Sequence, residues 1–257
     1  MFFRILKKDL KRKKTMNIIL LLFVILCSMF AAASVNNIIA VTGGIEHYFD
    51  MAEMTDADVM INGENEFEEK VKNLPSVSEI RKEPYYTIMS SKSFMHKGTE
   101  LTNFINPANL ISDSEMALNY FDKDNNIIKN VEKGTFYATT PFTADTDIRE
   151  DDEITIKVDD AELTLKYMGY FKGAAFFTES SAGPFLIVNA GDLDKLKSET
   201  ASEYADYAKT LYINTDDIDE LQNLASDYNV YLSTKETDKG IYLYDMLTAY
   251  IMMAISI

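Results

Sequence analysis

The sequence is poor in the residues from which proteins build catalytic and metal sites. Its 257 residues include one cysteine, Cys27, and two histidines, His47 and His96, which lie far apart along the chain. They cannot be assembled by motif into a nucleophile with its base or into a zinc site. No glycine-rich loop ends in Gly-Lys-Ser or Gly-Lys-Thr, so no ATP phosphate site is indicated. We therefore predict no enzyme activity, metal or cofactor, we assign no site residues, and we expect both histidines to be exposed.

Acidic side chains are abundant, but they form no recognisable site. Because the chain has 41 Asp and Glu residues, neighbouring carboxylates are common by chance, and we give them no catalytic role. The run "DKDNN" (122–126) resembles the start of a calcium loop. However, Ile127 occupies the position of the sharp-turn glycine and Lys133 that of the closing glutamate. We interpret this run as a solvated turn.

Charged residues are absent from Thr15 to Ile45. As a helix this segment would measure roughly 46 Å. A bilayer core is about 30 Å thick, whereas the apolar region of a secretory signal usually has about 7–15 residues. We predict a retained transmembrane helix over 15–41 and an outward stalk over 42–55. A cleaved signal is the alternative, because "FAAAS" offers small residues that a signal peptidase accepts.

The two sides of this apolar segment carry opposite charge. Residues 1–14 hold seven Lys or Arg and one acid, Asp9, a net charge of +6. Subtracting these from the 25 basic and 41 acidic residues of the whole chain leaves 18 and 40, a net of −22. Positive charge beside a span stays in the cytoplasm, so we expect a plasma-membrane protein whose N-terminus is inside and whose acidic bulk is outside. Such a bulk would repel nucleic acid, and with Cys27 in the bilayer it would contain no disulfide.

Both ends of the chain suggest contact with a membrane. In residues 1–14, Phe3, Leu6 and Leu10 recur at helical spacing, which predicts a basic amphipathic helix on anionic membrane lipid. A plain basic flank that only sets topology is an equal alternative. Residues 240–257 turn apolar again, and we predict the start of a second, truncated transmembrane helix. The alternative is an amphipathic helix docked on the domain.

The pattern between these ends predicts an α+β extracytoplasmic domain over 56–239. A strand, a helix and a strand follow one another early in the chain, and the same order returns late. The early elements are "ADVMI" (57–61), "NEFEEKVKNL" (65–74) and "VSEI" running into "YYTIM" (77–89); the late ones are "TLYIN" (210–214), "DDIDELQNLASDY" (216–228) and "VYL" (230–232). Two such units predict a ferredoxin-like layer of sheet and helices.

The residues between these units predict further strands. Apolar residues alternate on both sides of Asp159-Asp160, which indicates a hairpin. "PFLIVNAGDLDKLK" (184–197) adds a strand and a short helix, and the less regular stretch 93–133 is a possible inserted subdomain. The aromatic clusters "TFYATTPF" (135–142) and "GYFKGAAFF" (169–177) could form a binding lip, but core packing is the favoured interpretation.

The order of these features resembles the N-terminal part of a MacB/FtsX-type ABC transporter permease. The residues that carry the resemblance are "FFRILKKDLKRKK" before the span, "ADVMI…VKNLPSVSEI" after it, "IREDDEITIKVDDAELTLKYMGYF" and "FLIVNAGDLDKL". Asp152 and Gly169 fit the family's strand–turn–strand pattern, whereas Asp151 stands where the family often has glycine. Each motif is mainly a hydrophobic pattern, so the resemblance rests on their order along nearly the whole chain.

The resemblance implies a mechanical role. It implies a cytoplasmic ABC ATPase and a second permease subunit as partners, and an outer domain that moves an exported peptide, an antibiotic, a lipoprotein or a cell-wall enzyme. The alternative from another class is a membrane-anchored binding or sensor module without a transport role. That module would share the basic flank, the span and the α+β domain.

Overall fold

The structure, a computed structural model, divides the chain into two units, Met1–His47 and Tyr48–Ile257. The second unit is called the sheet unit below. The residues described are 13–63, 65–102, 107–144, 146–175, 183–200 and 205–255. The amphipathic helix predicted over 1–14 lies almost wholly outside them, and so do Phe176 and Phe177 of the second aromatic cluster.

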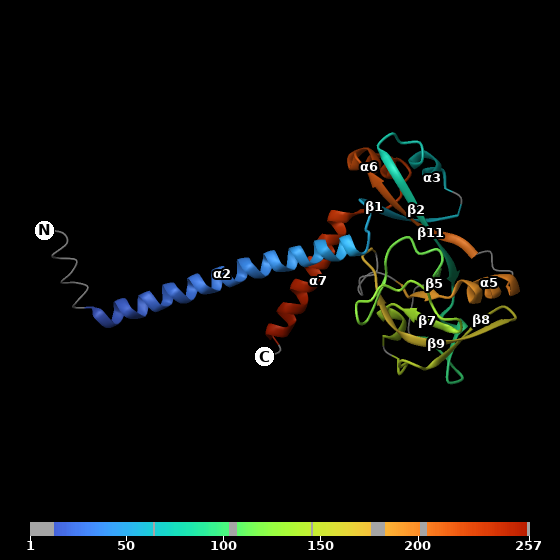
Figure 1. Cartoon of the computed structure of the whole chain (residues 1–257), viewed down its shortest axis with the longest axis horizontal. Coiled ribbons are helices and arrows are strands. Elements are labelled where there is room, and N and C mark those ends of the chain that lie inside the picture. Colours follow the sequence, from blue (N-terminus) through green and yellow to red (C-terminus); the bar gives the residue numbers. More distant parts are fainter. Residues whose placement is uncertain are drawn as a thin grey trace. The chain divides into compact units, whose positions relative to one another are not determined.

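The apolar segment forms one unbroken helix, α2 (Lys14–Met51), drawn in blue in Figure 1. Within the described residues it is the one helix that is long and apolar enough to cross a membrane, with a mean hydropathy of 2.8 in its most apolar window. The hydroxyls of Ser28, Ser34 and Thr42 donate to carbonyls four residues earlier, at 2.8–2.9 Å. These bonds satisfy the polar side chains within the helix, as a lipid environment requires. The helix also passes Gly43 and Gly44 without a break.

The two predicted strand–helix–strand units form one antiparallel layer. The first comprises β1 (Ala57–Asn62), α3 (Glu66–Val71) and β2 (Val77–Ile88), and the second β11 (Ala205–Thr215), α6 (Ile218–Asp227) and β12 (Leu232–Thr234). Their strands lie in the order β12-β1-β11-β2, and each pairs antiparallel with its neighbour. This is the ferredoxin-like arrangement that the repeated order predicted.

Polar side chains fix where the two helices begin. The Asn65 side chain accepts a hydrogen bond from the Phe67 amide at 2.9 Å, and that of Asp217 accepts one from Glu220 at 3.0 Å. Each satisfies an amide that has no partner inside its helix. Asn65 is therefore the start that the sequence predicted.

The last strand of this layer lies two residues later than predicted. The amide of Val230 donates to the Ala225 carbonyl, and Asn229 adopts a left-handed conformation with φ 53°. These are the marks of a helix that ends in a Schellman turn. Because the amide of Val230 closes this turn, Val230 does not pair with β1. Pairing begins at Leu232, opposite Val59.

The chain between β2 and β11 continues the same sheet. From β2 the order is β5-β10-β7-β9-β8-β3-β4, and β6 pairs with β9. The bounds are η1 (Ser91–Ser93), β3 (Phe94–His96), β4 (Thr99–Glu100), β5 (Ala108–Ser112), β6 (Phe121–Asp122), β7 (Thr135–Ala138), α4 (Thr140–Thr143), β8 (Glu153–Val158), β9 (Ala161–Lys172), β10 (Phe185–Val188) and α5 (Ala190–Glu199). The β8–β9 hairpin turns at Asp159-Asp160 as predicted, with Asp159 at φ 51°. The chain then leaves β12 into α7 (Lys235–Ile255).

Two apolar clusters hold the sheet unit together. One joins β1 and β11 to α3 and α6, through residues such as Val59, Phe67 and Leu221. The other fills the continued sheet, where Phe136 and Phe142 are fully buried and their rings meet edge to face at 5.7 Å. The described residues of the aromatic clusters therefore pack mainly in the core, which was the interpretation favoured from the sequence, although Tyr170 is 38% exposed.

Candidate functional site

The two faces of the ferredoxin-like layer differ in chemistry. Alternate residues of a strand point to opposite faces, so Ala57, Val59 and Ile61 pack toward α3 and α6 while Asp58 points the other way. Asp58 stands opposite Tyr212 of β11, which stands opposite Arg81 of β2. This polar face receives the end of α2, the first turns of α7 and the segment 113–121. We call this region the junction.

The end of α2 is bound to β2 through Arg81. Its guanidinium donates to the Glu53 carbonyl at 2.6 Å and to the Ala117 carbonyl at 2.7 Å. Asn119 adds two further bonds, from its amide to the Ala52 carbonyl at 3.0 Å and from Nδ2 to the Met51 carbonyl at 2.9 Å. The last carbonyls of a helix have no partner within it. Here the carbonyls of Tyr48, Phe49 and Asp50 accept from amides of the turn that follows the helix, and Asn119 supplies the partner of the Met51 carbonyl.

Aromatic rings join the end of α2 to α7. The fully buried Phe49 meets Tyr242 of α7 edge to face at 5.6 Å, and Tyr48 meets the same ring at 5.9 Å. The Tyr242 hydroxyl donates to the Gly173 carbonyl, just after β9, at 2.5 Å. Burial raises the pKa of Tyr48 to about 12, so its hydroxyl stays neutral. These rings thus join the last turn of α2, from Tyr48 on, to α7 and to the end of β9.

A buried acid lies beneath this attachment. Glu83 of β2 is fully buried and accepts hydrogen bonds from the Tyr120 hydroxyl at 2.7 Å and the Ala117 amide at 2.9 Å. The Tyr85 hydroxyl lies 3.1 Å from the same carboxyl. Burial raises the pKa of Glu83 to about 7, and these hydrogen bonds oppose the rise. Glu83 therefore anchors the segment that caps α2.

A pair of buried acids lies where α7 begins. Asp58 is fully buried and Asp238, in the first turn of α7, is 5% exposed. The hydroxyl of Ser233 donates to Asp238 Oδ1 at 2.8 Å. Lys235 forms an ion pair with Asp50 at 3.6 Å, so charge also links the start of α7 to the end of α2.

Sequence patterns alone did not identify the junction. Asp58 lies inside "ADVMI", which we interpreted only as an apolar strand. A carboxylate in the middle of such a run is the signal that could have marked it, because an unpaired buried charge is costly. Glu83 and Arg81 carried no comparable signal, since Ala117, which contacts both of them, lies 34 and 36 positions away in the sequence.

The two histidines have different environments. His47 is exposed as expected, but the expectation for His96 was wrong. Pairing of β3 with β8 brings His96 to Asp152, with Nε2 3.0 Å from Oδ2, and Nδ1 lies 3.2 Å from Asp147. The ring is only 4% exposed. The sequence did not reveal this, because the carboxylates that flank the ring come from more than 50 positions away.

The calcium-like run forms the turn that we predicted. Asp122 accepts hydrogen bonds from the amides of Asp124 and Asn126 at 2.9 and 2.8 Å, and Asn125 has φ 64°. The carboxylate of Asp122 thus closes the turn. In the described part of the chain, no group of three or more His, Cys, Asp or Glu residues is placed to hold a metal ion.

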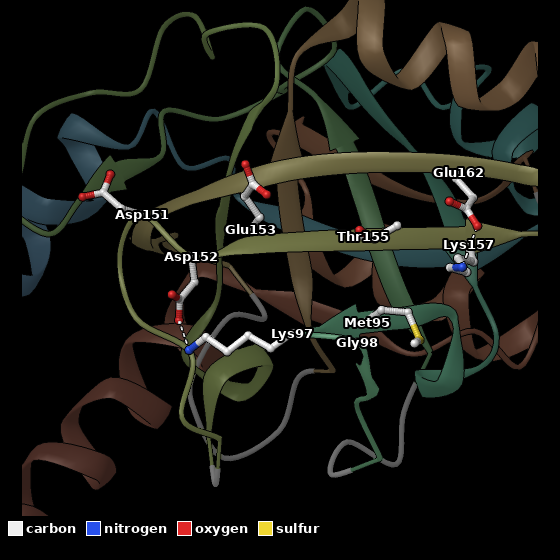
Figure 2. A pocket seen from close by; sticks show the side chains of 9 residues that line it. All are labelled: Met95, Lys97, Gly98, Asp151, Asp152, Glu153, Thr155, Lys157 and Glu162. Atoms are coloured by element: carbon white, nitrogen blue, oxygen red, sulfur yellow. Dashed lines mark hydrogen bonds and ion pairs between the residues drawn. The ribbon is translucent and has the colours of Figure 1, made fainter.

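A groove of about 480 Å³ lies beside β3, β8 and the start of β9. Figure 2 shows Lys97 directed toward Asp152, at 3.4 Å, and Lys157 toward Glu162, at 2.5 Å. Asp151 at its rim pairs with Lys166 at 2.6 Å. Each of these three carboxylates is paired with a lysine, and the three do not converge on one point, so they form no nucleophile–base set.

Comparisons with known proteins found solved structures only. No protein-family model matches the sequence, and no curated protein matches it. A protein named as a lipoprotein from Bacillus anthracis is similar, at 8% identity and a TM-score of 0.40, over 70% of this chain and 98% of that one. The periplasmic region of MacB from Actinobacillus actinomycetemcomitans is similar at 10% identity and a TM-score of 0.35, over 77% and 97%. A domain of a protein named as a permease from Porphyromonas gingivalis is similar at 9% identity and a TM-score of 0.34, over 69% and 88%.

Proposed function

We propose that this chain is the N-terminal portion of a permease subunit of a MacB/FtsX-type ABC transporter. In this proposal α2 crosses the plasma membrane with the basic N-terminus inside, and the sheet unit lies outside. A separate cytoplasmic ATPase supplies the energy, and a second permease subunit completes the assembly. The sheet unit performs no chemistry and passes movement to an exported substrate or an envelope partner.

The observation that carries the proposal is the construction of the junction. The end of α2 and the first turns of α7 bind the same face of the sheet and share the Phe49–Tyr242 contact. A shift of either helix must therefore move the sheet or break buried contacts, because packed interiors have low compressibility. The order of basic segment, apolar helix and ferredoxin-like unit supports the same function, as does the family resemblance of the sequence.

Hydrogen exchange would test the proposal in the assembled transporter. The full-length permease would be reconstituted with its ATPase in lipid nanodiscs, and amide exchange would be measured with and without ATP at constant pH. We expect ATP to change exchange in residues 48–54 and 235–242, on the opposite side of the membrane from the nucleotide. Identical exchange in these segments while the ATPase is active would contradict the proposal and favour a tethered binding module.

A further inference from the structure

The first turn of α7 contacts the sheet through two carboxyl groups. In the pairing of β1 with β12, Asp58 stands opposite Ser233, and α7 begins two residues later at Lys235. The carboxyl of Asp238 lies within hydrogen-bonding reach of Asp58 and accepts a bond from the Ser233 hydroxyl. The contact therefore joins β1, the neighbour of the edge strand β12, to the helix that follows β12.

This contact lacks the donors that two charged carboxylates would need. Within the described residues, both oxygens of Asp58 and Oδ2 of Asp238 are buried and receive no hydrogen bond. Two ionised carboxylates buried beside each other would each lose solvation and repel the other. One proton between them removes both penalties, because one acid then donates to the other.

Among the described residues, the charged groups near the pair have other partners. On α7, Lys235 pairs with Asp50 of α2, and Lys239 pairs with Glu236 at 2.8 Å. On β11, Tyr212 stands beside Asp58 and carries no positive charge. Beyond it on β2, Arg81 donates to the Glu53 and Ala117 carbonyls, and Glu83 adds a further acid.

We propose that Asp58 and Asp238 share one proton and form a latch that holds the first turn of α7 on β1 in acid and releases it as the pH rises. Loss of the proton leaves two adjacent buried anions, and separation of α7 from β1 relieves their repulsion. Tyr242 follows Asp238 by one helical turn, so it lies on the same side of α7. Release of the latch should therefore also loosen the contact of Tyr242 with Phe49. The latch does not depend on a transport role, so its test is separate from that of the proposed function.

The direction of the pH dependence follows from the two acids. Burial, and then the charge of Asp238, raise the pKa of Asp58 well above its ordinary value of 3.8. Burial also raises the pKa of Asp238, while the Ser233 hydroxyl opposes the rise. A pKa that is higher in the closed state than in the open state means that closure takes up protons. The latch is fully stabilised below the ordinary Asp range and weakens as the pH rises through the raised values, with the two acids titrating as one pair.

Distance measurements on the full chain in detergent micelles would test the latch. In a Cys27→Ala background, spin labels would be placed at Asp227→Cys on α6 and Tyr244→Cys on α7, both exposed positions of the sheet unit. Electron–electron double resonance would then report the distance distribution between about pH 4.5 and pH 8.5. We expect one narrow distance at the acid end, with its population falling by about half or more at the alkaline end.

Matched variants separate the latch from other titrating groups. Asp238→Asn carries a neutral amide that can donate to Asp58, so it should keep the narrow distance throughout this pH range. Asp194→Asn, an exposed change on α5, should leave the response of the parent protein intact. A pH response that persists in Asp238→Asn would assign it to another acid, such as Glu83, and overturn the latch.

Two further outcomes would also reject it. If the distance distribution of the parent protein stays narrow at every pH, the latch proposal is rejected without the need for a variant. Loss of the narrow distance on adding EDTA at the acid end would show that a metal ion, and not a proton, neutralises the pair.

Discussion

Replacing Glu83 with glutamine should remove a pH-dependent part of the stability of the sheet unit. Burial raises the pKa of this carboxyl from 4.5 to about 7 in the folded state. Because the folded value is the higher one, the contribution of Glu83 is fully present below about pH 4.5 and is lost as the pH rises through about 7. The difference between the two values corresponds to about 3 kcal/mol in the free energy of unfolding.

Urea unfolding of the full chain in detergent, followed by near-ultraviolet circular dichroism, would measure this effect. The free energies of unfolding of the wild type and Glu83→Gln are compared at each pH. The Asp58–Asp238 pair titrates in both proteins, so its contribution cancels in the difference. From about pH 4.5 to about pH 8.5, the free energy of unfolding of Glu83→Gln should rise by about 3 kcal/mol relative to that of the wild type. Glu100→Gln, an exposed change on β4, should show no such shift. Parallel stability curves for the wild type and Glu83→Gln would refute the reasoning.

Three further predictions concern topology, retention and the junction. Protease added outside intact cells should digest the region 56–239 and spare an N-terminal tag; digestion of the tag alone would reverse the orientation. The mature protein should keep its first 33 residues and stay in the membrane pellet after carbonate washing, whereas a soluble product starting near Ser34 would indicate a cleaved signal. Phe49→Ala should lower the free energy of unfolding by about 3–5 kcal/mol, because it empties a fully buried site. As a control, Tyr231→Ala, at a side chain that is 67% exposed, should change the free energy of unfolding by about 0.5 kcal/mol or less. Equal losses in the two variants would argue against the packing described for Phe49.

Local patterns predicted most of the elements of this fold. The alternation on both sides of Asp159-Asp160 gave the hairpin, and Asn65 marked the start of α3 because capping depends on neighbours in the sequence. The repeated strand–helix–strand order gave the ferredoxin-like layer, since each unit must bury one apolar face of its helix. These features depend on periodicity and short-range hydrogen bonds, which a single sequence displays.

The junction could not be predicted in the same way. Arg81 and Glu83 acquire their roles only when the segment 113–121 folds over β2, and His96 is buried only because β3 pairs with β8. The strand β12 begins two residues later than predicted because the helix before it ends in a turn at Asn229. That turn has no glycine, the residue that usually marks such an ending. Such features depend on which distant segments meet, and the hydrophobic pattern constrains that only loosely.

The most direct test of the central claim is to interrupt α2 where it leads to the junction. A flexible Gly-Ser segment would be inserted at Thr42–Gly44 of the full-length permease reconstituted with its ATPase, and a matched insertion would be made in the Asp159-Asp160 turn. If α2 transmits movement, the first insertion should abolish the ATP-dependent change in amide exchange of residues 48–54 while folding and ATP hydrolysis continue. The second insertion should preserve that change. An ATP response that survives the insertion at Thr42–Gly44 would contradict the mechanical role and leave a tethered binding module as the better explanation.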